Sequence, residues 1–210
     1  MRSPTFEAVA FACALTLITL SMSAHSALLS EDDPFFGPGS ITQDTATRLQ
    51  WLDVPLSKGL TVSEVLSEIN PAGAFRGMRY ATAAELTRLF QDAGIPVIGP
   101  VSGQQNLNYP IAQSLINLVG ATAAQGVFPE TVGFFDATPR GPTADIDFFF
   151  QGQSPAYLVG VGDAFRNPDL HWSTIGHWLV REVPEPRAWL LVAVGAFMCA
   201  RTVARLRRTG

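Results

Sequence analysis

Apolar residues recur at helical spacing in residues 60–69, directly after a helix-start signal. Thr61 and Glu64 have the spacing of a capping box, in which each side chain accepts a hydrogen bond from the other residue's backbone N–H. We therefore expect a helix here, stapled at its start by Leu60. The stripe expected to be buried consists of Val62, Val65, Leu66 and Ile69.

A second helix is predicted over residues 82–93. Thr82 and Glu85 repeat the capping box, and Gly94 with Pro96 after it ends the pattern. The residues expected to face inward are Leu86, Leu89, Phe90 and Ala93. Because capping explains both glutamates, we interpret Glu64 and Glu85 as structural residues.

A third helix is expected after Asn108, with Pro110 in its first turn and Gly120 at its end. The residues expected to face inward are Ile111, Leu115, Leu118 and Val119.

Alternation of apolar and polar residues predicts strands on both sides of these helices. Residues 44–54 alternate with Leu49 and Trp51 on one face, whereas residues 28–40 are rich in acid, Pro and Gly and read as a mobile lead-in. Further strands are expected in residues 131–137, 144–152, 156–163 and 171–182. Helices followed by strands predict an α+β domain, in which early capped helices pack on a mainly antiparallel sheet.

Asp145 and Asp147 are two residues apart on one of these strands. Their side chains would share a face, about 7 Å apart along the chain, which suits a calcium ion or a glycosidic bond. Ile146, Phe148 and Phe150 would take the opposite face. We favour the simpler interpretation of an exposed acidic face over an apolar one.

The other polar groups do not form a recognisable site. His171 and His177 would be about 20 Å apart on one straight strand, too far to share a metal ion. Asp163, Asn167 and Asp169 lack the spacing of a calcium loop and are expected in a polar turn. Nucleophile, zinc-protease and phosphate-binding motifs are missing in their required contexts, so we predict no enzyme activity, no metal and no cofactor.

Aromatic residues offer a weaker hint of sugar binding, because exposed rings can stack on sugars. Their alternation with Leu and Val favours core packing instead. The residues in question are Trp51, Trp172, Trp178, Tyr80, Tyr109 and Tyr157.

Charge and cysteine content narrow the class of protein. Residues 27–183 contain 16 acidic and 8 basic side chains, a net charge of −8, so nucleic acid is not an expected partner. Cys13 and Cys199 both lie outside this range, so the domain is expected to fold without disulfides or thiolate ligands.

Residues 1–26 read as a secretory signal peptide. Arg2 precedes an apolar run over residues 8–20, and Ala24 and Ser26 suit cleavage after Ser26. An uncleaved anchor helix is the alternative, and both interpretations export the residues that follow.

The last residues read as a membrane anchor. Residues 189–200 are uncharged and apolar, and a span of about 188–204 is reached if Arg201 extends its side chain to the headgroups. Trp189 would mark the outer interface. Arg201, Arg205, Arg207 and Arg208 would hold the C-terminus in the cytoplasm. A buried core helix with a basic end is the alternative.

Pro184, Glu185 and Pro186, followed by this apolar segment and the arginines, resemble the PEP-CTERM sorting signal of Gram-negative bacteria. The apolar segment is shorter than the family's pattern. The resemblance implies that a membrane-embedded exosortase recognises Pro184, Glu185 and Pro186 and removes the tail. It also implies signal peptidase as a partner and a final location at the cell surface or in a polysaccharide matrix. The chain then divides into a signal peptide (1–26), an exported domain (27–183) and a sorting tail (184–210).

A second resemblance concerns the domain. Residues 76–86, "RGMRYATAAEL", are similar to part of the C-type-lectin-like domains of the formylglycine-generating-enzyme and DUF1566 kind. Met78 and Tyr80 depart from that pattern, replacing Trp and Leu-Pro. The resemblance implies a helix pair packed on a twisted sheet.

These observations favour a non-catalytic exported protein that binds or structures matrix polysaccharide. Two alternatives stay open: a glycan hydrolase that uses Asp145 and Asp147, and a calcium-stabilised adhesion module.

Overall fold

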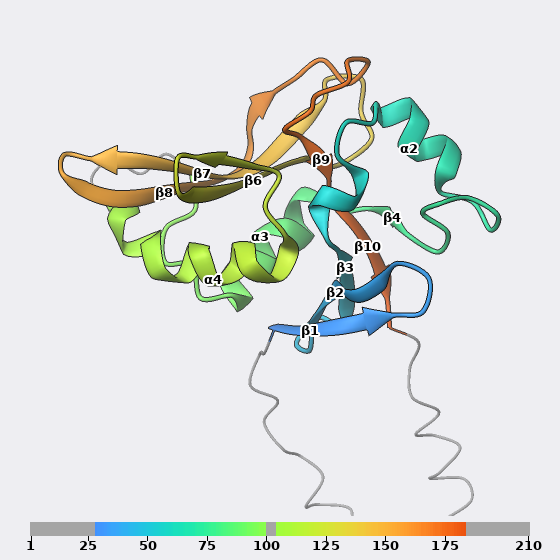
Figure 1. Cartoon of the computed structure of the whole chain (residues 1–210), viewed down its shortest axis with the longest axis horizontal. Coiled ribbons are helices and arrows are strands. Elements are labelled where there is room, and N and C mark those ends of the chain that lie inside the picture. Colours follow the sequence, from blue (N-terminus) through green and yellow to red (C-terminus); the bar gives the residue numbers. More distant parts are fainter. Residues whose placement is uncertain (1–27, 100–103, 184–210) are drawn as a thin grey trace, which may run out of the picture.

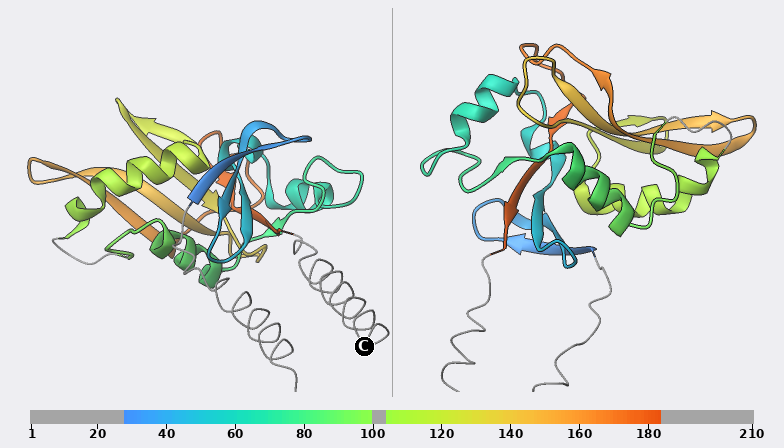
Figure 2. Two further views of the ribbon diagram at one scale, coloured as in Figure 1. Left: turned by 90° about the horizontal axis from the view of Figure 1, so that it is seen from below. Right: turned by 180° about the vertical axis from the view of Figure 1, so that it is seen from behind.

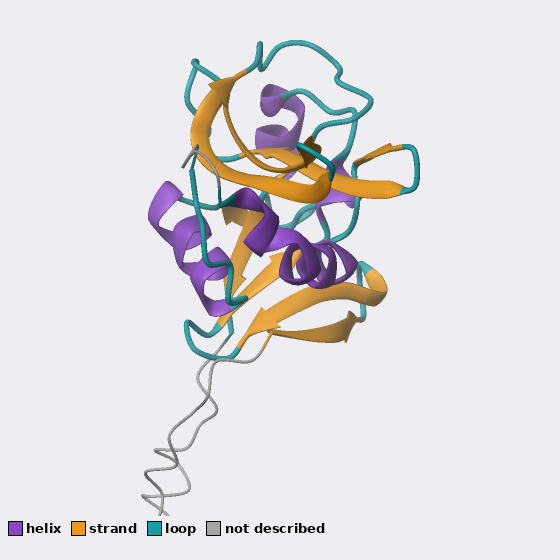
Figure 3. Cartoon of the chain, turned by 90° about the vertical axis from the view of Figure 1, so that its left-hand side faces the viewer, coloured by secondary structure: helices purple, strands orange, loops and turns teal. Residues whose placement is uncertain are grey.

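Two sheets, with two of the three α-helices between them and the third at the outer side, make up the described part of the chain, residues 28–99 and 104–183, in the computed structural model (Figure 1). Both sheets are built mainly from antiparallel strand pairs. Figure 3 shows the layers, with strands above and below and helices in the middle. The predicted α+β class with mainly antiparallel strands is therefore confirmed, and strands lie on both sides of the helices in the chain, as expected.

The first sheet has the strand order β1-β2-β3-β10-β4. Its register places Leu28, Asp44, Leu49 and Glu182 in one row across four neighbouring strands. The start of β1 and the end of β10 therefore lie at the same end of this sheet (Figure 1). The strands are β1 (Leu28–Asp33), β2 (Gly37–Asp44), β3 (Leu49–Leu52), β4 (Arg79–Tyr80) and β10 (Leu179–Glu182).

The second sheet has the order β5-β6-β7-β8, and a short strand, β9, pairs with β6 in parallel. Its β7–β8 hairpin extends away from the first sheet in every view (Figures 1 and 2). The strands are β5 (Ala123–Gln125), β6 (Phe128–Phe134), β7 (Pro142–Gln151), β8 (Ser154–Phe165) and β9 (Gly176–His177).

The three predicted helices are present, as α2 (Val62–Glu68), α3 (Ala83–Asp92) and α4 (Tyr109–Val119). Both predicted capping boxes form, with Thr61 and Thr82 at the N-caps. Short 3-10 helices, η1 (Val54–Ser57) and η2 (Gln105–Asn108), complete the set. Helix α4 contacts β1 and β2 of the first sheet and β6 and β8 of the second, so it belongs to the layer between them.

Two buried stripes differ from the prediction because of what each helix packs against. Leu66 of α2 is 48% exposed, since this helix covers only a small satellite core around Val65. Ile116 of α4 is 1% exposed, although it was not expected to face inward, while Ile111 and Leu118 are half-buried. A helix between two sheets buries a wider stripe than a helix on one surface.

The prediction of a mobile lead-in over residues 28–40 is wrong. These residues form β1, the following turn and the start of β2. Asp33 Oδ1 accepts hydrogen bonds from the backbone N–H groups of Phe35 and Phe36, at 2.7 and 3.0 Å. The acidic, glycine-rich composition thus serves a tight turn, because a short carboxylate can satisfy the backbone there.

The predicted strand over residues 171–182 is also partly wrong. Only β9 and β10 are strands, and Trp178 between them carries the chain from the second sheet to the first. Trp178 is fully buried, and its Nε1 donates to the Ala144 carbonyl at 3.0 Å. Its ring meets Trp51 and Phe90 edge to face. A Cβ atom on Gly133 would lie 2.8 Å from this ring, so the glycine is required for the two sheets to meet.

Within the described residues, no helix is long and apolar enough to cross a membrane. The predicted signal peptide, residues 1–26, and the predicted span, about 188–204, lie outside these residues.

Candidate functional site

The carboxyl groups of Asp145 and Asp147 lie on the same face of β7, as predicted. The opposite face carries Ile146 and Phe148, which are 0% and 5% exposed and belong to the main core. The expected exposed acidic face is wrong, however, because Asp145 is only 6% exposed and Asp147 is half-buried. This site therefore buries carboxylates instead of displaying them.

A third carboxyl group reaches the site from β8. The register of β7 and β8 shifts between Thr143 and Ala144, which leaves Gly162 and Asp163 of β8 as extra residues. A Cβ atom on Gly160 would lie 2.9 Å from Asp163 Oδ2 and 3.1 Å from Asp145 Oδ1. Both carboxylates thus border the space that a side chain at position 160 would fill. Sequence reasoning placed Asp163 in a turn, and the only local signal of the irregularity is Gly162, whose φ is +75°.

Burial, followed by the neighbouring carboxylates of Asp147 and Asp163, raises the pKa of Asp145 to about 7, although the charge of Arg166 acts in the opposite direction. Burial also raises the pKa of Asp147. Asp145 Oδ1 is buried and accepts no hydrogen bond from the described residues. The Asp145 and Asp147 side chains are in hydrogen-bonding contact, and one proton shared between them is the arrangement that this geometry favours.

Because they are in hydrogen-bonding contact, the carboxyl groups of Asp145 and Asp147 are closer together than the carboxyl pair of a glycosidase, for which the spacing is about 5 Å or about 6.5–9.5 Å. Among the described residues, no three His, Cys, Asp or Glu side chains are placed to hold a metal ion. The chemistry that Asp145 and Asp147 support directly is therefore the uptake and release of a proton.

The two histidines lie closer than the straight-strand prediction allowed, because His171 is in a loop. His171 Nδ1 lies 2.9 Å from the Gly59 carbonyl, and His177 Nε2 lies 3.0 Å from the Leu60 carbonyl. A carbonyl only accepts, so His177 Nε2 carries the proton and Nδ1 accepts from the Tyr80 hydroxyl at 2.7 Å. Burial lowers the pKa of His177 to about 4, so this ring is neutral at pH 7. Both of its nitrogens are occupied, which leaves none for a metal ion.

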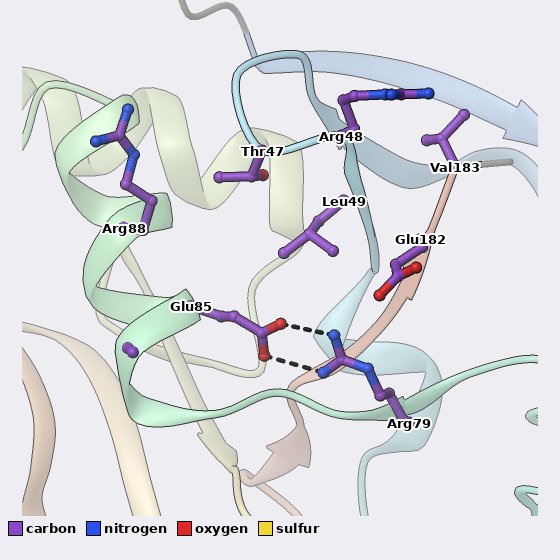
Figure 4. Close-up of a pocket in the computed structure, with 9 residues that line it drawn as sticks. Thr47, Arg48, Leu49, Arg79, Glu85, Arg88, Glu182 and Val183 are labelled. Carbon is purple, nitrogen blue, oxygen red and sulfur yellow. Dashed lines mark hydrogen bonds and ion pairs between the residues drawn. The ribbon is translucent and has the colours of Figure 1, made fainter. Parts of the chain in front are cut away.

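A surface pocket of about 460 Å³ lies beside the end of β10 (Figure 4). Arg79 and Glu85 form a bidentate pair across it, with N–O distances of 2.9 and 2.6 Å. Hydrogen bonding to Arg79 lowers the pKa of Glu85 to about 2. Glu85 is thus both a helix cap and an ion-pair partner, in agreement with its predicted structural role. The pocket is lined by Thr47, Arg48, Leu49, Arg79, Ala84, Glu85, Arg88, Glu182 and Val183.

The aromatic residues named in the sequence divide into two groups. Trp51, Trp178 and Tyr157 are at most 1% exposed, which confirms core packing for these three. Tyr80, Tyr109 and Trp172 are half-buried.

The residues predicted for signal cleavage, for the sorting motif and for the membrane anchor lie outside the described residues. They are Ala24, Ser26, Pro184, Glu185, Pro186, Trp189, Arg201, Arg205, Arg207 and Arg208. Comparisons of the chain with models of protein families, with curated proteins and with solved structures found no match.

Proposed function

We propose that this chain is an exported protein sorted by its C-terminal tail, with residues 27–183 as a non-catalytic module that binds or organises matrix polysaccharide. Signal peptidase would remove residues 1–26. An exosortase-type enzyme would then read Pro184, Glu185 and Pro186 while residues 188–204 lie in the inner membrane with the arginines on the cytoplasmic side. The processed domain would finish at the cell surface or in the extracellular matrix.

The observation that carries this proposal is the position of the two ends of the domain. Leu28 and Glu182 occupy one row of the first sheet, with two strands between them. Three strand spacings amount to about 14 Å. Both flanking segments are thus attached at the same side of the domain, so one membrane surface can serve an N-terminal leader and a C-terminal anchor alike.

The side-chain chemistry supports a binding module over an enzyme. Glu64 and Glu85 cap helices, and His177 is neutral with both nitrogens in use. Asp145 and Asp147 are in contact with each other, closer than the carboxyl pair of a glycosidase. Residues 76–86 are similar to part of the C-type-lectin-like domains, which also favours a binding module. We therefore propose that residues 27–183 have a C-type-lectin-like fold.

Mass spectrometry of the protein's C-terminus in fractionated native cells tests this proposal. We expect the outermost fraction to contain chains that end near residues 184–186. Chains that reach Gly210 in that fraction would overturn the proposal, because the tail would then travel with the domain.

Two variants sharpen this experiment. Replacing Pro184 and Pro186 together with Ala should leave the full-length chain in the inner membrane, because the stiff recognition peptide is lost. Arg187→Gln is the matched control, since Arg187 follows the motif directly but is not part of it, and its processing should be normal. Equal processing of both variants would show that the Pro-Glu-Pro residues are not recognised.

A further inference from the structure

The free end of the β7–β8 hairpin belongs to a part of the molecule that carries no formal charge. No Asp, Glu, Lys or Arg occurs in residues 93–129 or in residues 148–162, although the domain is otherwise rich in acid. These two stretches include η2, α4, β5 and the distal half of the β7–β8 hairpin. We use the term uncharged tip for residues 104–109, 125–128 and 148–154.

The uncharged tip exposes apolar side chains. Phe150 is 59% exposed, Leu107 is 52% exposed and Val127 is 87% exposed. Phe150 is held in place by two rings beneath it, because it meets Phe128 and Phe148 edge to face, at centroid distances of 6.0 and 5.1 Å. An exposed ring whose position is already set loses little conformational entropy when a ligand stacks on it.

The uncharged tip also carries amide side chains. Gln153 and Asn106 are exposed and Gln151 is half-buried. The Gln151 Oε1 atom accepts a hydrogen bond from the backbone N–H of Asn106 at 3.2 Å, which joins the hairpin to η2. Each amide side chain offers both donors and acceptors without a charge.

We propose that the uncharged tip is a docking surface for a neutral polysaccharide. The C–H face of a pyranose ring stacks on an aromatic face, and its hydroxyl groups pair with amide donors and acceptors. A glycan that carries carboxylates or sulfates, or a nucleic acid, would need cations at the site, and the uncharged tip supplies none. This inference rests on the proposed function, since it names the matrix component that the exported domain would meet.

Affinity electrophoresis of the full chain, in detergent, tests the proposal with hydroxyethylcellulose as a neutral polymer and alginate as an anionic one. We expect hydroxyethylcellulose to retard the protein and alginate not to. Retardation should be unchanged between about 50 and about 500 mM salt, because no ion pair takes part. Retardation by alginate alone, or by neither polymer, would overturn the proposal.

Phe150→Ala should weaken binding to hydroxyethylcellulose about tenfold, the loss expected for one stacked ring. Phe165→Ala is the matched control, because Phe165 is 54% exposed at the opposite end of β8, next to Arg166. Thermal unfolding of both variants checks that they fold. An equal effect of the two variants would overturn the proposal.

Sedimentation of the same variants measures their oligomeric state. It therefore tests whether the uncharged tip binds a second copy of the chain instead of a polysaccharide. If Phe150→Ala dissociates an oligomer and leaves binding to the polymer unchanged, the tip is a self-association surface and the proposal is wrong. The test is independent of tail processing. Normal processing without polymer binding would therefore reject the docking surface and leave the sorting proposal standing.

Discussion

Asp33 in the first sheet and Asp145 in the second are buried to the same degree, each 6% exposed, but the pKa values of their carboxyl groups shift in opposite directions. Burial opposes ionisation of Asp33, yet hydrogen bonds from Phe36 and Arg181 lower its pKa. Burial and the carboxylates of Asp147 and Asp163 raise the pKa of Asp145 to about 7, and the charge of Arg166 offsets this only in part. Burial alone therefore does not decide the charge of an aspartate; the donors that reach it do.

The two sheets differ in where those donors come from. Arg181 of β10 donates to Asp33 Oδ2 at 2.5 Å and to Gln50 Oε1 at 2.8 Å, and Gln50 in turn donates to Glu31 Oε2 at 3.0 Å. Strands β1, β3 and β10 of the first sheet thus supply a connected polar network. In the second sheet, β7 and β8 contribute the acids of the site without a matching donor for Asp145 Oδ1. We expect the first arrangement to stabilise the fold and the second to make its stability depend on pH.

The largest effect is expected from Arg181→Met. This change leaves the Asp33 carboxylate buried without its cation, and it should destabilise the domain by about 3 kcal/mol at pH 7. Urea unfolding measures the loss. Arg88→Met is the control, because Arg88 pairs with Asp92 four residues away on the same helix and its side chain is 54% exposed, against 27% for Arg181. Losing such a pair costs about 0.5 kcal/mol. Equal losses for the two variants would show that the network around Asp33 stabilises the domain no more than the Arg88–Asp92 pair does.

Asp145→Asn should instead stabilise the domain as the pH rises. The folded-state pKa of Asp145 lies above its unfolded value, so its contribution to stability is complete below about pH 4. That contribution is lost as pH rises toward and through about 7. An amide in its place can still donate to Asp147 but cannot ionise. Relative to the unchanged protein, the variant should therefore gain about 2 kcal/mol between pH 5 and pH 8.

Unfolding experiments on both proteins at these two pH values measure that gain. Taking the difference between the proteins cancels the titration of His177, which is shared by both. Asp169→Asn, a change at an exposed loop aspartate, is the control and should show no such trend. A pH-independent difference for Asp145→Asn would contradict the shared-proton interpretation.

Tyr80→Phe is expected to have the smallest effect, and it concerns the junction between the sheets. Tyr80 of β4 donates to His177 of β9, so the change leaves a buried ring nitrogen without a donor, at a cost of about 1 kcal/mol. Thermal unfolding at pH 7 measures this loss. Tyr109→Phe is the control, because among the described residues the Tyr109 hydroxyl accepts a single long bond, 3.3 Å, from Gln113. A larger loss for the control would mean that the Tyr80 hydroxyl does not join the sheets.

Sequence patterns predicted the helices best and the acidic segments worst. The capping boxes at Thr61 and Thr82, and the buried face of α3, follow from residues at most a few positions apart. The prediction that the acidic start of the domain is mobile is wrong, because this segment is ordered by pairing with β2 and by the ion pair with Arg181. The local sequence pattern shows neither partner. The face shared by Asp145 and Asp147 was predictable from strand alternation, but its burial was not.

The sequence alone thus determined the features that depend on local geometry: the helices and their caps, the alternation along β7, and the terminal motifs on which the sorting proposal depends. Only the tertiary structure decided which aspartates are ionised, where Trp178 links the two sheets, and that Leu28 and Glu182 share one row. The physical reason is the separation along the chain between the residues that interact. A helix closes its hydrogen bonds within four residues, whereas the bond from Arg181 to buried Asp33 and the contact between Trp51 and Trp178 join residues more than a hundred positions apart in the chain.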